Sequence, residues 1–191
     1  MQQSVFRVIL YIPLFCIVLF FTSCRNESVE KGELTRLLDC FKKITVVFPD
    51  DLIKVQSGEE SDFTLDAVPH LVFYFDSTNC ASCEMHHIGG LYKFFNDERY
   101  GKEFDIIALF SPKEDDLNDI LIETRYVPHD YPMYIDSTGS FAKTNTGIPV
   151  DRRFHVFLLD RENHPVYIGD PRNGEKLEKL MWKHINHLNN N

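Results

Sequence analysis

Two cysteines separated by two residues are the part of this sequence with the clearest chemical potential. Cys80 and Cys83 enclose Ala81 and Ser82, and they follow an apolar run at 70–75 (HLVFYF). If a helix begins at this motif, its unpaired N–H groups and positive end stabilise a thiolate, whose pKa then falls below the free value of about 8.5. We therefore expect Cys80 to be the attacking thiolate and Cys83 to resolve the mixed disulfide that it forms.

The same segment also allows metal binding. On a helix, His87 lies one turn after Cys83, and thiolates and imidazoles are ligands that copper and zinc accept. We expect no metal and no other cofactor, and we keep a copper or zinc site at Cys80, Cys83 and His87 as the alternative. Covalent haem attachment is not expected, because Glu84 rather than a histidine follows Cys83.

Apolar runs of strand length alternate with helical patterns on both sides of the motif. We expect strands at 70–75, 104–110, 132–135, 154–159 and 165–168, and helices at 34–44, 81–98, 113–125 and 175–188. Strands that alternate with helices imply a parallel sheet, and nearly continuous apolar runs suit strands covered on both faces. The last two strands are joined by a short turn, so they form an antiparallel hairpin at one edge. One or two further short strands are expected within 45–66.

The order of these features resembles the thioredoxin-like superfamily. The C-x-x-C motif follows a buried strand and opens a helix, and residues 157–168 (FLLDRENHPVYI) are similar to the closing hairpin of membrane-anchored thioredoxins. The resemblance covers about residues 66–188 and extends to lipid-anchored thioredoxin-like proteins of Bacteroides-type bacteria. It implies an α/β fold, a thioredoxin-like three-layer α/β/α arrangement with a mixed central sheet and an N-terminal helical extension, and thiol–disulfide exchange at the motif.

Several positions near the motif depart from the family pattern. Asn79 stands where thioredoxins usually have Trp, and Tyr74 stands where they have a buried acid, with Asp76 two residues later. The family also has a cis-proline directly before the hairpin strand. Without gaps this position is His155, where a trans bond is expected because a cis bond costs about 2.5–4 kcal/mol before a residue other than proline. Pro149 fills the position only if an insertion follows it. The residues expected to bind substrate or tune the dithiol are Asn79, Ala81, Ser82, His87, Pro149 and His155.

The amino end has the pattern of a secretory signal. An apolar stretch follows Arg7; it is short for a spanning helix and typical of a signal h-region. It ends in Phe21-Thr22-Ser23-Cys24, which resembles a bacterial lipobox. We expect residues 1–23 to be removed and Cys24 to carry the lipid that anchors the protein in the cell envelope, outside the cytoplasm. An uncleaved signal anchor is the alternative.

Composition and charge bound the remaining possibilities. The chain has 191 residues, of which 43% are hydrophobic, and this fits one domain with extensions. Its formal net charge is −9, whereas nucleic-acid binders carry basic surfaces, so we expect no nucleic-acid partner. The expected domains are a signal peptide at 1–23, a tether and N-terminal extension at 24–65, a thioredoxin-like domain at 66–188 and a disordered tail at 189–191. Cys40, on the first predicted helix, is expected to be a small buried residue.

Two functions remain open from the sequence alone. The first is an envelope-anchored thiol–disulfide oxidoreductase, whose partners are a protein or small thiol substrate, an envelope redox partner and the membrane. The second is a non-enzymatic thioredoxin-fold lipoprotein, either a copper or zinc carrier or an interaction module, in which Cys80 and Cys83 form a structural disulfide.

Overall fold

The computed structural model describes residues 32–78, 85, 88–126 and 131–190. The chain divides into one unit that ends at Cys40 and a second that begins at Phe41. Residues 32–41 are helical, and Cys40 is exposed. The expectation of a buried Cys40 is therefore wrong: neighbouring helical residues point about 100° apart, and the buried position falls on Phe41. Within the described ranges, no helix has the length and apolar character needed to cross a bilayer.

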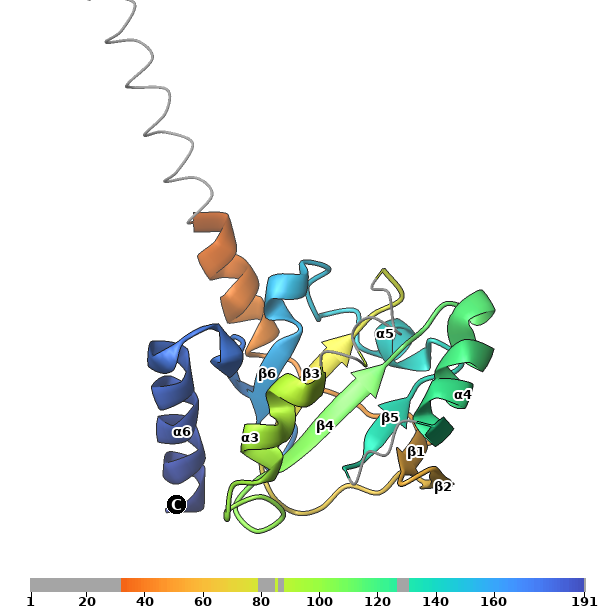
Figure 1. Cartoon of the computed structure of the whole chain (residues 1–191). Helices are drawn as coiled ribbons and strands as arrows, with labels where there is room; N and C mark the ends of the chain where they lie inside the picture. Colours follow the sequence, from red (N-terminus) through yellow and green to blue (C-terminus); the bar gives the residue numbers. More distant parts are fainter. Residues whose placement is uncertain (1–31, 79–84, 86–87, 127–130, 191) are drawn as a thin grey trace, which may run out of the picture. The chain divides into compact units, whose positions relative to one another are not determined.

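The second unit is built on a seven-stranded mixed sheet (Figure 1). Its strands are β1 (Ile53–Gln56), β2 (Glu59–Asp62), β3 (His70–Phe75), β4 (Asp105–Phe110), β5 (Met133–Ile135), β6 (Val156–Leu159) and β7 (Pro165–Ile168), in the order β2-β1-β5-β4-β3-β6-β7. β3, β4 and β5 run parallel, whereas β6 is antiparallel to β3 and forms a hairpin with β7. Strands β4-β3-β6-β7 thus have the thioredoxin-like arrangement, and the predicted fold class is confirmed.

Side chains of β3, an inner strand of the sheet, alternate between two covered faces, which explains its nearly continuous apolar sequence. Leu71, Phe73 and Phe75 join a large core that includes buried residues of α4 and α6. Tyr74 points to the opposite face, where its ring lies 4.9 Å from that of Phe141 in α5. The sheet is therefore the middle layer of three, as a strand buried on both faces requires.

The helical segments of the second unit differ in their bounds from those that the sequence pattern predicts. They are η1 (Ile88–Leu91), α3 (Tyr92–Phe95), η2 (Glu114–Asp116), α4 (Leu117–Tyr126), α5 (Ser140–Thr144), η3 (Arg152–Phe154), η4 (Pro171–Asn173) and α6 (Glu175–Asn189). The described part of the helix predicted at 81–98 is a helical Met85 followed by η1 and α3. α6 continues through Asn189, one residue into the predicted tail.

The unpredicted helix α5 is held in place by one buried carboxylate. Asp136 is fully buried and accepts hydrogen bonds from the backbone N–H groups of Ser140 and Phe141, both at 3.0 Å. It also accepts a bond from the Ser111 hydroxyl at 2.9 Å, which ties the start of α5 to the end of β4. Asp136 is the first residue of the turn that precedes α5, and its carboxylate holds the start of that helix.

Candidate functional site

The carboxyl end of β3 is the point from which the chain enters the C-x-x-C segment. After the buried Phe75, Asp76 accepts two hydrogen bonds from Thr78, at 3.0 Å from the backbone nitrogen and at 2.6 Å from the hydroxyl. These bonds form a local turn after the strand, in which Thr78 is exposed. In open α/β sheets, the space beyond the carboxyl ends of the parallel strands is where functional groups gather.

His155 lies beside this strand end, directly before β6. Its carbonyl accepts a hydrogen bond from the Tyr74 backbone N–H at 2.9 Å, and its ring centroid is 5.0 Å from that of Tyr74. Only 4% of the residue is exposed. The hydrogen-bond ladder between β3 and β6 therefore includes His155, one residue before β6 begins. This places an imidazole against the end of β3.

The hydrogen bonds of His155 fix the tautomer of its neutral ring. Nε2 lies 2.9 Å from the carbonyl oxygen of Pro149, and because a carbonyl only accepts, Nε2 carries the hydrogen. In the neutral ring, Nδ1 then presents a lone pair. Nδ1 is buried without a hydrogen-bond partner among the described residues, and the nearest carboxylate oxygen, on Asp76, is 3.8 Å away. The site thus holds one uncommitted ring nitrogen next to a carboxylate.

Tyr74 occupies the position where the family resemblance implies a buried acid. Burial raises the pKa of its phenol, and the negative charges of Asp76 and Asp136 raise it further, against the opposing effect of a hydrogen bond with Ser111. The phenol consequently stays protonated at neutral pH.

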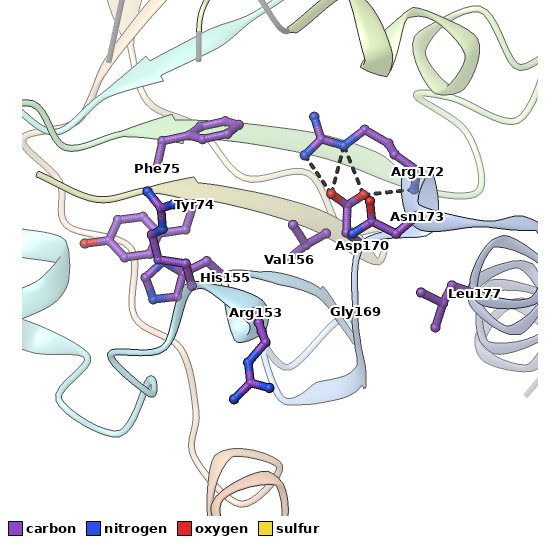
Figure 2. A pocket seen from close by; sticks show the side chains of 11 residues that line it. Tyr74, Phe75, Arg153, His155, Val156, Gly169, Asp170, Arg172, Asn173 and Leu177 are labelled. Atoms are coloured by element: carbon purple, nitrogen blue, oxygen red, sulfur yellow. Dashed lines mark hydrogen bonds and ion pairs between the residues drawn. The ribbon is translucent and has the colours of Figure 1, made fainter. Parts of the chain in front are cut away.

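Two cavities share Tyr74 and His155 as walls. We call the first, of about 320 Å³, the arginine cavity (Figure 2). It is lined by Tyr74, Phe75, Arg152, Arg153, His155, Val156, Gly169, Asp170, Arg172, Asn173 and Leu177. The second, of about 390 Å³, is the proline cavity, lined by Tyr74, Asp76, Ser77, Ala142, Asn145, Thr146, Ile148, Pro149, Val150 and His155. The carboxyl end of β3 is therefore hollowed by two adjoining depressions.

Two aspartate–arginine pairs with the same local geometry flank the arginine cavity. Asp170 precedes η4 and accepts hydrogen bonds from Nε and Nη2 of Arg172, the shortest at 2.7 Å, as Figure 2 shows. Asp151 precedes η3 and accepts from Nε and Nη2 of Arg153, the shortest at 2.6 Å. Each aspartate also accepts the backbone N–H of its arginine. Both guanidinium groups are thereby fixed in orientation.

The structure brings together two of the residues predicted from the sequence. Pro149 and His155 are joined by the 2.9 Å contact between carbonyl and imidazole, so they form one wall rather than competing for one position. Cis peptide bonds are absent from the described ranges, so the bonds preceding Pro149 and His155 are both trans. The other predicted site residues, Cys24, Asn79, Cys80, Ala81, Ser82, Cys83 and His87, lie outside the described residues. In the part of the chain that is described, no group of three or more potential metal ligands occurs.

Sequence reasoning missed the arginines at the cavity. A signal was present in the repeated Asp-x-Arg spacing, at Asp151–Arg153 and at Asp170–Arg172. An aspartate directly before a short helical turn accepts backbone N–H groups, and an arginine two residues later can reach the same carboxylate. The sequence could not show that the two motifs, far apart in the chain, border the same cavity.

Solved structures of similar proteins include three from bacterial thioredoxin-like proteins. An uncharacterised thioredoxin-like protein from Porphyromonas gingivalis is 18% identical, with a TM-score of 0.45 over 76% of this chain and 94% of that one. An exposed lipoprotein thioredoxin from Streptococcus pneumoniae is 12% identical, with 0.47 over 70% and 97%. The thioredoxin domain of a thiol–disulfide oxidoreductase from Bacteroides vulgatus is 16% identical, with 0.46 over 74% and 98%. No protein-family model and no curated protein matches the chain.

Proposed function

We propose that this protein is a thiol–disulfide oxidoreductase of the cell envelope that uses Cys80 and Cys83 as its redox pair. The observation that carries the proposal is the position of the motif in the chain: Cys80 comes five residues after Phe75, the last residue of β3, in a thioredoxin-like sheet. This is the point in the sequence at which the resemblance to thioredoxins implies a redox dithiol.

The described residues supply a suitable environment for exchange at that strand end. His155 offers an imidazole nitrogen without a hydrogen-bond partner among the described residues, and Asp76 offers a carboxylate 3.8 Å from it. Val150, 87% exposed beside Pro149, adds an apolar contact point at the edge of the proline cavity. A partner protein that reaches the dithiol can therefore contact both apolar and titratable groups.

The proposed reaction is a two-step exchange of electrons and sulfur bonds. The Cys80 thiolate attacks a substrate disulfide, forms a mixed disulfide and releases one substrate thiolate, which takes up a proton. The Cys83 thiol loses its proton and attacks the Cys80 sulfur, which releases the second substrate thiol and leaves a Cys80–Cys83 disulfide. The substrate gains two electrons and the protein dithiol loses two. The reverse sequence oxidises a substrate dithiol.

Anchoring belongs to the same proposal. Lipid on Cys24 would hold the domain at a membrane outside the cytoplasm, where protein disulfides form and need exchange. The support for this part is the apolar stretch and the small residues before Cys24 in the sequence. Labelling with a radioactive fatty acid, in the wild-type chain and in Cys24→Ala, tests it separately from the redox chemistry.

Trapping of mixed disulfides is the experiment that tests the redox function. The full chain carrying Cys83→Ser should accumulate covalent complexes with partner proteins in cells, because no second thiol releases them. Cys80→Ser and the double variant should accumulate none. The exposed Cys40 provides a matched control, and Cys40→Ser should leave the trapped complexes unchanged.

Two outcomes would contradict the proposal. If the Cys83→Ser variant and the double variant, which lacks both cysteines, trap partners equally, Cys80 is not the attacking group. Stoichiometric copper or zinc binding by the purified chain, lost in Cys80→Ser, Cys83→Ser, together with the absence of trapped partners, would favour a carrier.

A further inference from the structure

We infer that the arginine cavity is a substrate subsite that binds acidic side chains flanking the cysteine of a partner polypeptide. This inference rests on the proposed function and deepens it by naming the class of substrate. The cavity shares Tyr74 and His155 with the end of β3, so an occupant of the cavity lies next to the strand from which the C-x-x-C motif emerges.

Arginines are concentrated at this cavity, although the chain as a whole is acidic. The protein has 29 acidic and 20 basic residues, yet this cavity is lined by three arginines and one aspartate. These three are a third of the nine arginines in the sequence. Asp170 pairs with Arg172, and Asp151, which is outside the lining, pairs with Arg153, so arginines exceed aspartates here by one. A local excess of positive charge on a negative protein attracts a carboxylate.

Asp170 and Asp151 fix the orientation of the guanidinium groups of Arg172 and Arg153 before any ligand binds. Arg172 gives Nε and Nη2 to Asp170, and its guanidinium lies 5.1 Å from the ring centroid of the buried Phe73. Nη1 of Arg172 has no hydrogen-bond partner in the described ranges, which leaves an N–H edge for a carboxylate. The hydrogen bonds from Arg153 lower the pKa of Asp151, so that pair stays ionised well below neutral pH.

The remaining lining favours a peptide over a free inorganic anion. Phe75, Val156 and Leu177 add apolar surface, and Figure 2 shows Leu177 of α6 at the end of the cavity away from Tyr74 and His155. A volume of about 320 Å³ is at the lower end for ligand sites and suits a few side chains. An extended segment with an acidic residue beside its cysteine offers both an apolar and an anionic part.

The test compares two pairs of blocked peptides with the full chain in detergent solution. The reactive pair consists of disulfide-linked dimers of Ala-Glu-Cys-Glu-Ala and of Ala-Lys-Cys-Lys-Ala. The unreactive pair has serine in place of cysteine and carries a fluorophore for anisotropy. At low salt, the reduced protein should react at least about tenfold faster with the glutamate dimer, and the glutamate serine peptide should bind tighter by a similar factor. Salt at about 0.5 M should remove most of both preferences.

Charge reversal at the cavity provides the matched variants. Arg153 is 68% exposed at its side chain, so Arg153→Glu should fold and should lower the preference for glutamate about tenfold. Arg172→Gln, which keeps a hydrogen-bond donor, should lower it as well. Lys102→Glu makes the same change of charge at an exposed position between α3 and β4 and should leave the preference intact.

The outcomes separate this inference from the proposed function. If both disulfide peptides react at equal rates and both serine peptides bind equally, or if the preference survives Arg153→Glu and Arg172→Gln, the inference is overturned while the redox function stands. If neither disulfide peptide reacts but the glutamate serine peptide binds preferentially through Arg153, the redox function fails and the acidic subsite stands. A simple effect of net charge predicts the opposite preference, for lysine.

Discussion

His155 is the residue that connects the fold to the candidate site. Its carbonyl extends the β3–β6 ladder, its Nε2 holds the Pro149 carbonyl, and its ring packs on Tyr74. The resemblance to thioredoxins indicated that this position lies beside the dithiol. That Pro149 and His155 act together could not be read from the sequence, because it depends on the path of the residues between them.

Removing the His155 side chain should loosen this connection. We expect His155→Ala to lower the free energy of unfolding by about 2–3 kcal/mol, since it leaves a cavity at a residue only 4% exposed and an unpaired Pro149 carbonyl. His155→Gln keeps a donor within reach and should lose less. Urea unfolding of the full chain measures both changes.

His164, at the surface, serves as a control for the stability loss of the His155 variants. His164 is 44% exposed at its side chain, and His164→Ala should change the free energy of unfolding by less than about 1 kcal/mol. Equal losses for the His155 and His164 variants would show that the imidazole beside β3 does not hold the loop at Pro149.

At the scale of the elements, α5 depends on a single side chain. It has only five residues, too few to be stable without outside support, and Asp136 bonds the first two N–H groups of the helix. Phe141 of this helix is fully buried and packs on Tyr74. A disturbance at Asp136 therefore reaches the face of the sheet that carries the candidate site.

Substitution of Asp136 should be among the most destabilising changes in the chain. Asp136→Ala should cost about 3 kcal/mol, because it removes a cap and leaves the Ser111 hydroxyl and two N–H groups without their acceptor. Asp136→Asn keeps one oxygen and should cost less. Urea denaturation of both variants checks this order.

The exposed Asp62 at the end of β2 serves as the comparison, and Asp62→Ala should change stability by less than about 0.5 kcal/mol. If Asp136→Ala also lowered the free energy of unfolding by less than about 0.5 kcal/mol, α5 would be held by packing alone.

The elements with a strong local sequence pattern are those that could be predicted from the sequence. Strands β3, β4, β6 and β7 were predicted within one or two residues, because each is an apolar run bounded by turn residues. Helix α5 was missed, since five residues carry no helical periodicity and its cap is a carboxylate that also fits a plain turn. The placement of β1 beside β5 was not predicted either, because strand pairing across 77 residues leaves no mark on local sequence.

The stability of the whole molecule should depend on pH through His70, at the amino end of β3. The residue is 2% exposed, and neither ring nitrogen has a hydrogen-bond partner in the described part of the chain. Burial lowers the pKa of His70 from 6.5 to about 4, with only partial opposition from the charge of Asp66. The folded protein therefore keeps this ring neutral where an unfolded chain would protonate it.

The sign of the effect follows from this difference in proton binding. The unfolded state takes up a proton below pH 6.5 and the folded state only below about 4, so stability is full above pH 6.5 and falls between 6.5 and 4. The loss should reach about 3 kcal/mol at most, from 1.36 kcal/mol for each unit of pKa. Urea unfolding at pH 7, 5.5 and 4.5 should show this fall in the wild type and a flatter profile in His70→Leu.

A profile for His70→Leu that is parallel to the wild type would assign the acid sensitivity to other groups.

The most direct test of the redox proposal is the reduction potential of the Cys80–Cys83 pair in the full chain. The protein would be equilibrated in glutathione buffers of graded ratio, quenched by alkylation, and the peptide that carries both cysteines quantified by mass, with the Cys40 peptide as an internal reference. A reversible two-electron transition between about −120 and −270 mV is the predicted result. A pair that stays oxidised to below about −300 mV, or that never forms a disulfide, would contradict the proposed exchange reaction and leave a thioredoxin-like fold without redox activity.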